Sequence, residues 1–285
     1  MARLISADRA AMHRLLSCVR YEVIPTASIE GRVRDTVPTG VTVTVTASPT
    51  RGLEPTLDLV DRLTGAGYRV VPHLSARLIT GRPHLVDIVA RLTGAGVRDV
   101  FVPAGDADPP AGPYDAALPV LALLSELGRP FPETGITGYP ESHPAIDDDV
   151  TVQAMWDKRL HATYIVSNLC FDPRVIARWV ARVRRRQVTL PVHLGLAGPV
   201  EPAKLAAMAT KIGVSESSRF LARHPSWFAR LVLPGGYAPE TLLRRTVRAT
   251  PGPAVAGLAG LHVFTFNQVE ATERWRRESL ERWQS

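Results

Sequence analysis

Short apolar segments rich in β-branched residues alternate along this chain with longer amphipathic segments. Eight of the short segments have the length of a strand, and helical periodicity runs between them. Strand and helix alternating eight times over 285 residues predict an α/β fold of the (β/α)8 TIM-barrel type. The strands are expected at residues 19–25, 41–47, 68–74, 99–105, 134–139, 162–169, 189–196 and 261–267.

A short internal repeat supports this organisation. The segment Arg62–Gly67 reads Arg-Leu-Thr-Gly-Ala-Gly and recurs as Arg91–Gly96, about one strand–helix unit later. Each copy ends a predicted helix and precedes a predicted strand. A dinucleotide fingerprint must instead follow a strand, so these glycines predict helix C-caps.

The helical segments surround the strands in a single-domain arrangement. We expect one catalytic domain over residues 1–285, because no Pro- or Ser-rich linker divides the chain, and we expect the segment 1–18 to form a helix that caps the barrel. The stretch from Gly198 to Gly260 is too long for one crossover and predicts extra helices between the seventh and eighth strands. Helices are expected at 53–65, 83–94, 114–127, 173–186 and 202–212, and the extra ones near 215–223, 225–230 and 239–250.

Composition indicates a cytoplasmic protein. The chain is 45% apolar, and Cys18 and Cys170 are far apart, without the spacing of a zinc site or a disulfide framework. No apolar run is long enough to span a bilayer. The net charge of +7 comes from dispersed arginines at predicted helix ends, where cations complement the helix dipole, so neither nucleic acid nor a membrane is an expected partner.

Glu22 is the most informative single residue. It lies in the apolar strand Arg20-Tyr-Glu-Val-Ile-Pro25, where alternation places it on one face with Ile24 and places Tyr21 on the other. A carboxyl group on an interior face is costly unless it is paired, protonated or lining a cavity. We expect Glu22 to be a proton donor, and a buried ion pair is the structural alternative.

In a barrel of this type, the residues at the carboxyl ends of the strands form the active site. The predicted strand ends are polar and carry carboxylates but no lysine, which excludes a Schiff-base mechanism. They lack a local pair of metal ligands such as His-x-His, so no metal is expected. The residues expected there are Glu22, Thr46, Ser48, His73, Ser75, Asp106, Asp108, Tyr139, Glu141, His143, Ser167, Asn168, His193, Thr265, Asn267 and Gln268.

Several of these strand ends resemble the methylenetetrahydrofolate reductase family, which is itself an eight-stranded barrel. Tyr-Glu22-Val-Ile-Pro is similar to the family's Phe-Glu-Phe-Phe-Pro, and Pro-His73-Leu matches its Pro-His-Leu. The segments Val43–Thr46, Gly105–Pro110, Tyr139–Pro144 and Leu261–Asn267 resemble further family motifs, in order along nearly the whole chain.

The chain departs from the family at positions that contact flavin. Ala104 replaces an Arg before the Gly-Asp pair, Ala47 replaces a Tyr, and Trp156 lies where smaller polar residues are usual. A cofactor pyrophosphate without its Arg loses charge-assisted hydrogen bonds of about 1.5 to 3 kcal/mol each. FAD binding is therefore not expected, and the chain resembles the divergent actinobacterial branch that works without flavin.

The resemblance implies an oxidoreductase of one-carbon metabolism that reduces 5,10-methylenetetrahydrofolate to 5-methyltetrahydrofolate by direct hydride transfer from NADH or NADPH. It implies that Glu22 is the general acid, that Asp106 acts in catalysis and holds the pterin, and that Asn168 binds the substrate. The expected cofactor-binding residues are Thr46, His73, Tyr139, His143, Lys158 and Arg159. Two alternatives stay open, a flavin-dependent reductase and a non-catalytic folate-binding subunit.

Overall fold

The computed structural model describes residues 2–141, 148–199, 237–250 and 252–284. Its eight strands are parallel and form one sheet in the order β3-β2-β1-β8-β7-β6-β5-β4. The two ends of this order meet, because His73 forms a parallel bridge with Phe101 and the Leu74 backbone N–H donates to the Phe101 carbonyl at 2.8 Å. The chain is thus a (β/α)8 barrel, as predicted. The strands are β1 (Val19–Val23), β2 (Thr42–Val45), β3 (Val70–Pro72), β4 (Asp99–Phe101), β5 (Glu133–Gly138), β6 (Tyr164–Ser167), β7 (Val192–Ala197) and β8 (Leu258–Phe264).

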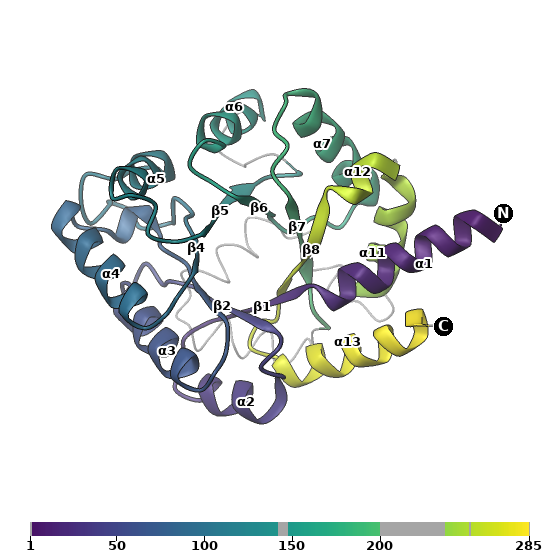
Figure 1. Ribbon diagram of the computed structural model, residues 1–285, viewed down its shortest axis with the longest axis horizontal. Helices are drawn as coiled ribbons and strands as arrows, with labels where there is room; N and C mark the ends of the chain where they lie inside the picture. Colours follow the sequence, from purple (N-terminus) through teal and green to yellow (C-terminus); the bar gives the residue numbers. More distant parts are fainter. Residues whose placement is uncertain (1, 142–147, 200–236, 251, 285) are drawn as a thin grey trace.

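Helices surround the strands as an outer ring, and the view in Figure 1 shows the strands at its centre. Among the described residues, no helix combines the length and apolar character that crossing a bilayer requires. The helices are α1 (Ala2–Ser17), α2 (Ile29–Thr36), α3 (Glu54–Gly65), the short 3-10 helix η1 (Ala76–Leu78), α4 (Arg82–Gly94), α5 (Ala117–Glu126), α6 (Asp148–Lys158), α7 (Pro173–Arg185), α11 (Pro239–Ala249), α12 (Gly252–Ala256) and α13 (Val269–Gln284).

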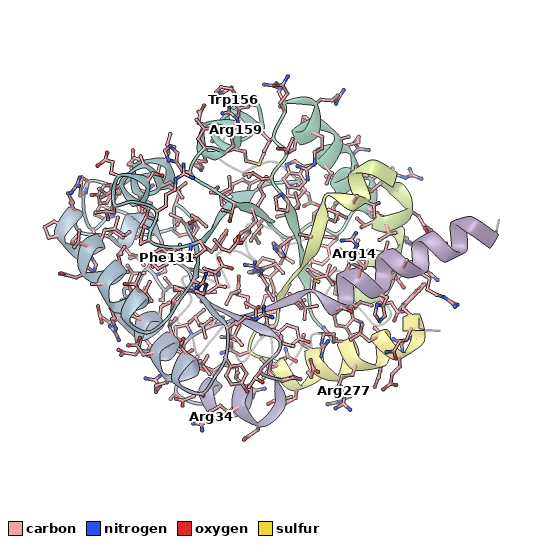
Figure 2. The ribbon with its side chains drawn as sticks, viewed as in Figure 1. Arg14, Arg34, Phe131, Trp156, Arg159 and Arg277 are labelled. Carbon is pink, nitrogen blue, oxygen red and sulfur yellow. The ribbon has the colours of Figure 1, made fainter. Side chains whose placement is uncertain are left out.

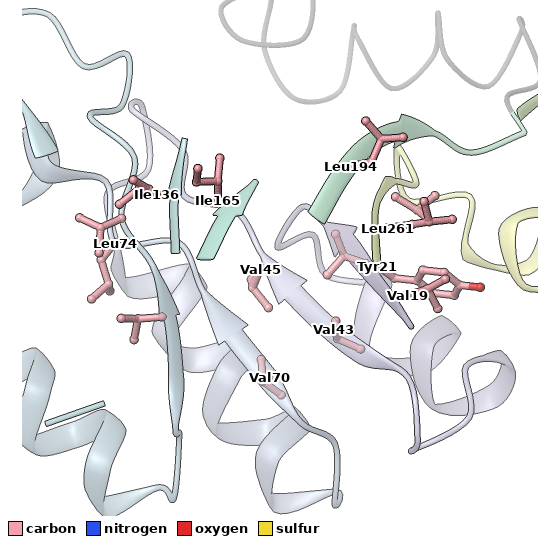
Figure 3. Close-up of a cluster of buried hydrophobic side chains, with 14 of the residues drawn as sticks. Val19, Tyr21, Val43, Val45, Val70, Leu74, Ile136, Ile165, Leu194 and Leu261 are labelled. Carbon is pink, nitrogen blue, oxygen red and sulfur yellow. The ribbon is translucent and has the colours of Figure 1, made fainter. Parts of the chain in front are cut away.

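The main hydrophobic core lies between the strands and the helices. Alternate residues of each strand point outward into it, and Figure 3 shows members of this layer such as Val43, Val45 and Leu261. These three side chains are fully buried. They belong to one continuous cluster that includes the apolar faces of the helices. Burial at about 25 cal/mol per Å² of apolar surface is the main force that holds the ring of helices on the barrel.

The repeated Gly-Ala-Gly segments end helices, as the sequence predicted. Gly67 follows α3 with φ +87°, and Gly96 follows α4 with φ +81°. Glycine adopts this left-handed conformation without the steric cost that a Cβ atom would add. Both residues therefore serve as C-caps that turn the chain into the next strand.

The structure differs in detail from the prediction at the eighth strand, and it describes only some of the helices that were expected before it. The eighth strand begins and ends three residues earlier than predicted, and it ends there because Phe266 and Asn267 have positive φ and form a turn. The helix expected at 239–250 is present as α11, whereas the helices expected at 202–212, 215–223 and 225–230 lie outside the described residues. Helix α1 packs against α11, α13 and β8, and in Figure 1 it extends outward between the two helices without crossing the barrel centre.

Candidate active site

Glu22 and His262 meet inside the barrel, where the last strand closes onto the first. The Oε2 atom of Glu22 lies 2.8 Å from the Nε2 atom of His262. The His262 side chain is 1% exposed and that of Glu22 is 16% exposed. The carboxylate is therefore paired with an imidazole in a largely dehydrated position, and it is the member of the pair that reaches toward solvent.

His73 completes the cluster from the third strand. Its Nε2 atom lies 3.9 Å from the same Glu22 oxygen, and its ring packs edge-on against Phe101 at a centroid distance of 4.8 Å. Burial lowers the pKa of His73 to about 4; the Glu22 carboxylate opposes this change and His262 adds to it. The imidazole of His73 is therefore neutral at physiological pH.

Strand alternation explains why these side chains face inward. On β1, Tyr21 and Val23 are fully buried against the helices, so Glu22 between them points into the barrel. On β8, His262 lies between the buried residues Leu261 and Val263, which face outward in the same way. The three polar side chains come from positions 22, 73 and 262, and barrel closure alone brings them together.

Tyr21, the neighbour of Glu22 that points outward, is held in place by a hydrogen-bond network. The Tyr21 hydroxyl donates to the Glu273 Oε2 atom on α13 at 2.8 Å, and Arg276 pairs with both carboxylate oxygens of Glu273. Both oxygens of this buried carboxylate are thus hydrogen-bonded. The network ties β1 to the outer helix immediately beside the residue that carries the inward-facing carboxylate.

A second polar layer lies below the cluster, toward the amino ends of the strands. Arg20 on β1 pairs with Asp99 on β4 at 2.8 Å, and the Tyr164 hydroxyl donates to the other Asp99 oxygen at 2.7 Å. Burial raises the pKa of Asp99, and Arg20 opposes that change. The side chains of His193 and Tyr164 meet edge-on with centroids 5.2 Å apart. These polar side chains lie below the cluster, and the carboxyl ends of the strands are the side on which barrels of this type carry their sites.

Several predicted site residues lie at those carboxyl ends. Thr46 follows β2 and its backbone N–H donates to Val23, and Asp106 is exposed in the segment after β4. Tyr139 follows β5, and burial raises the pKa of its hydroxyl, to which the charge of Asp106 adds. Asn168 follows β6, where its Oδ1 atom accepts a hydrogen bond from the Leu169 backbone N–H.

Other predicted site residues are not brought to the mouth. Lys158 ends α6 and Arg159 follows it, and a helix of this barrel returns the chain to the amino end of the next strand. The Arg159 guanidinium lies over the Trp156 ring at 3.6 Å, and Figure 2 shows this pair at the outer edge of the ring. The predicted role of Lys158 and Arg159 at a cofactor does not fit this position. His143 lies outside the described residues.

His262 is the residue that the sequence analysis missed. It lies in the strand predicted at 261–267, but its partner Glu22 is 240 positions away in the sequence. The available signal was its place between two apolar residues in a predicted strand, the same pattern that drew attention to Glu22. Strand alternation alone therefore predicts that His262 points into the barrel, as Glu22 does.

The comparisons with known proteins bear on the fold. No family model matches the chain. A protein from Burkholderia cenocepacia J2315, provisionally described as a lyase/mutase, superposes with a TM-score of 0.51 at 16% identity, covering 98% of this chain and 84% of that one. A second protein from Burkholderia cenocepacia J2315, provisionally described as a phosphonomutase, superposes with a TM-score of 0.52 at 10% identity, covering 99% of each chain. At these identities the likeness shows the shared fold.

The predicted methylenetetrahydrofolate reductase family is contradicted by these comparisons, because the two similar structures are described as a lyase/mutase and a phosphonomutase. The motifs behind the prediction are short segments at strand ends, where barrels of many functions place polar residues. The proton-donor role expected of Glu22 is not tested and stays a prediction; in the structure its carboxyl group is paired with His262. The predicted folate reduction and oxidoreductase class are therefore wrong, and the two alternatives that shared the resemblance fall with it.

The ligands named with that family are a separate matter. The structure tests none of the predicted ligands and partners, so all of these stay predictions: NADH or NADPH as hydride donor, no FAD, a folate partner, and no nucleic-acid or membrane partner. The expectation that no metal binds also stays a prediction. Glu22, His73 and His262 form a group whose possible ligand atoms all lie within 4.8 Å of one another.

Proposed function

We propose that this chain is an enzyme of the lyase or mutase type that acts on a small anionic substrate at the carboxyl end of the barrel. The observation that carries the proposal is the convergence of Glu22, His73 and His262 on one point inside the mouth. A carboxylate and two imidazoles that are nearly removed from water are unusual in a barrel interior, where branched apolar residues dominate. Such clusters are typical of catalytic sites.

The geometry supports chemistry in which charge develops on a substrate oxygen. Cleaving or moving a carbon–carbon or carbon–phosphorus bond next to a carbonyl leaves an electron pair that the carbonyl oxygen accepts. Hydrogen-bond donors that are already oriented in a poorly hydrated site stabilise that charge more than water does, and the imidazoles of His73 and His262 are the groups of the cluster that can donate. The second polar layer of Arg20, Asp99 and Tyr164 closes the barrel below, so the reacting oxygen lies beside the upper cluster.

The choice of reaction class rests on the barrels of the same fold that are described as a lyase/mutase and a phosphonomutase. One fold hosts many activities, so the residues of this site, and not the fold, must carry the test.

The experiment incubates the purified protein with three substrate classes: 2-oxo dicarboxylates, 2-hydroxy acids and phosphono-oxo acids. Proton and phosphorus NMR detect the products. We expect turnover of a member of at least one class, and a decrease of about 100- to 1,000-fold in Glu22→Gln and in His262→Gln. Glu126→Gln on α5 is the matched control for loss of a carboxylate, because Glu126 pairs with Arg82 on the outer surface.

Two results would contradict the proposal. Absence of turnover in all three classes would exclude the reaction type. Turnover that survives in the Glu22 and His262 variants at the level of the control would remove these residues from the reaction.

We also propose a cytoplasmic location. Cys18 and Cys170 are both free, and free thiols persist in a reducing compartment. Fractionation of the native cells with detection of the chain tests this, and recovery from the exported fraction would contradict it.

A further inference from the structure

Glu22, His73 and His262 have the donor atoms and the mutual closeness that a metal site requires. In a tetrahedral zinc site, ligand atoms lie about 2.0 to 2.2 Å from the ion, so that neighbouring ligand atoms are roughly 3.3 Å apart. Here the Glu22 oxygen lies 2.8 Å from the His262 nitrogen and 3.9 Å from the His73 nitrogen. All three atoms lie within 4.8 Å of one another, and these separations bracket the value for a shared ion.

A second observation points to a ligand at the same place. The Nε2 atom of His73 is buried, faces the Glu22 carboxylate, and has no hydrogen-bond partner. A buried polar atom without a partner is rare in folded proteins and calls for an explanation such as a bound ion. The Oγ1 atom of Thr44, on the residue paired with Glu22 in the neighbouring strand, is also buried without a partner. With the Nδ1 atom of His262, which is also buried without a partner, three unsatisfied polar atoms accompany this small cluster.

We propose that Glu22, His73 and His262 bind one divalent transition-metal ion, zinc in the first instance. Two imidazoles and one carboxylate suit zinc and related ions, whereas magnesium and calcium prefer sites made of oxygen atoms. Three protein ligands are the number found in catalytic zinc sites, in which the fourth position is open to water or substrate. The open position faces the mouth, because Glu22 at 16% is the most exposed of the three side chains, whereas His73 is 7% and His262 1% exposed.

The inference rests on the proposed function in placing the active site at this cluster, and it adds the group that would polarise the substrate oxygen. A bound divalent ion acts as a Lewis acid on a carbonyl or phosphoryl oxygen. The binding itself can be measured without any substrate. A failure of the metal site and a failure of the proposed reaction are therefore separable results.

The test uses the full chain without an affinity tag, treated with a chelator and then dialysed. Zinc chloride is titrated in competition with a chromophoric chelator, and cobalt(II) is added separately to record its visible spectrum. We expect one ion per chain and the strong visible absorption of four-coordinate cobalt. Glu22→Gln, His73→Gln and His262→Gln should each lower the zinc affinity by at least about 100-fold, more than the loss of a supporting residue causes.

His193→Gln is the matched control, because His193 is a mostly buried histidine of the layer below and is not part of the cluster. It should retain the wild-type zinc affinity. Circular dichroism of each variant shows whether it is folded, and the cobalt spectrum of the wild-type protein provides a readout that needs no variant.

Two outcomes would overturn the metal site. In one, the wild-type protein binds zinc no more tightly than the three variants and gives no four-coordinate cobalt spectrum, so that Glu22 and His262 form a hydrogen bond only. In the other, His193→Gln loses as much affinity as the three variants. Zinc binding without turnover would instead refute the proposed function and leave the site in place, and turnover by a protein that binds no metal would refute the metal site alone.

Discussion

The Nε2 atom of His262 on β8 lies 2.8 Å from the Oε2 atom of Glu22 on β1. The two strands are the last and the first of the barrel, and they pair in parallel from Val19 with Leu261 to Glu22 with Phe264. The contact therefore exists only when the barrel is closed. Because His73 lies at the other closure, between β3 and β4, the cluster depends on both junctions of the sheet.

Tyr21→Phe tests the network that supports β1. The substitution removes the hydroxyl that donates to Glu273 and leaves one acceptor position of a buried carboxylate without that donor. We expect the free energy of unfolding to fall by about 1 to 3 kcal/mol, measured by urea denaturation. Tyr114→Phe, at a partly exposed position, is the control and should change stability by less than about 0.5 kcal/mol. Equal effects of the two substitutions would show that the Tyr21 hydroxyl does not support β1.

Asp99→Asn tests the polar layer below the site. The change leaves Arg20 without its charged partner inside the barrel, where both side chains of the pair are less than one-fifth exposed. We expect a loss of about 3 kcal/mol in the free energy of unfolding. Glu126→Gln breaks the pair with Arg82 on the outer surface and should cost less than about 1 kcal/mol. Equal losses in the free energy of unfolding, measured by urea denaturation, would show that the Arg20–Asp99 pair is as well hydrated as a pair on the surface.

His193 predicts a specific dependence of stability on pH. Burial lowers its pKa from 6.5 to about 2, and Arg20 and His262 lower it further, so the folded chain holds it neutral. Between these two values the unfolded chain binds the proton and the folded chain does not, so stability falls as pH falls below 6.5. The loss is at most about 1.4 kcal/mol per pH unit from this residue. His193→Gln should therefore reduce the difference in unfolding free energy between pH 7 and pH 5, measured in urea. An unchanged difference would mean that His193 is charged in the folded protein.

Two glycine substitutions should act in opposite directions. A Cβ atom at Gly195 in β7 would lie 2.0 Å from the Ser167 backbone oxygen, a distance that the neighbouring strand cannot relieve without moving. Gly195→Ala should therefore destabilise the chain by more than about 2 kcal/mol. At Gly31 in α2, nothing lies within 4 Å of the added atom, so Gly31→Ala should raise stability by up to about 1 kcal/mol. Thermal unfolding of both variants checks this, and a stable Gly195 variant would show that β6 and β7 lie farther apart.

The sequence pattern predicted the barrel well, because each strand–helix unit carries its own periodicity. It placed the eighth strand three residues late because a contact between distant parts of the chain sets where the strand begins. Gly260 has no Cβ and lies against Cys18, where an added Cβ would be 2.1 Å from the Cys18 carbonyl oxygen, so the strand begins in a segment with little apolar signal. Close backbone approach of this kind depends on a partner far away in the sequence.

The site was predicted only in part for the same reason. Glu22 and His73 could be placed inside the barrel mouth from alternation and strand ends. The role of His262 required knowing which strands close the barrel, and the position of Arg159 required following α6 back to the amino end of β6. The family assignment failed because short strand-end motifs record a common architecture and not a reaction.

X-ray absorption spectroscopy at the zinc edge tests the central claim most directly, because it reports the atoms around the ion in the untagged, zinc-loaded protein. The arrangement of Glu22, His73 and His262 predicts only nitrogen and oxygen neighbours, at about 2.0 to 2.2 Å, with the multiple-scattering pattern of two imidazoles. A sulfur neighbour at about 2.3 Å would place the ion on a cysteine, and a spectrum without imidazole scattering would place it on the surface. Either spectrum would contradict a metal site in the barrel mouth.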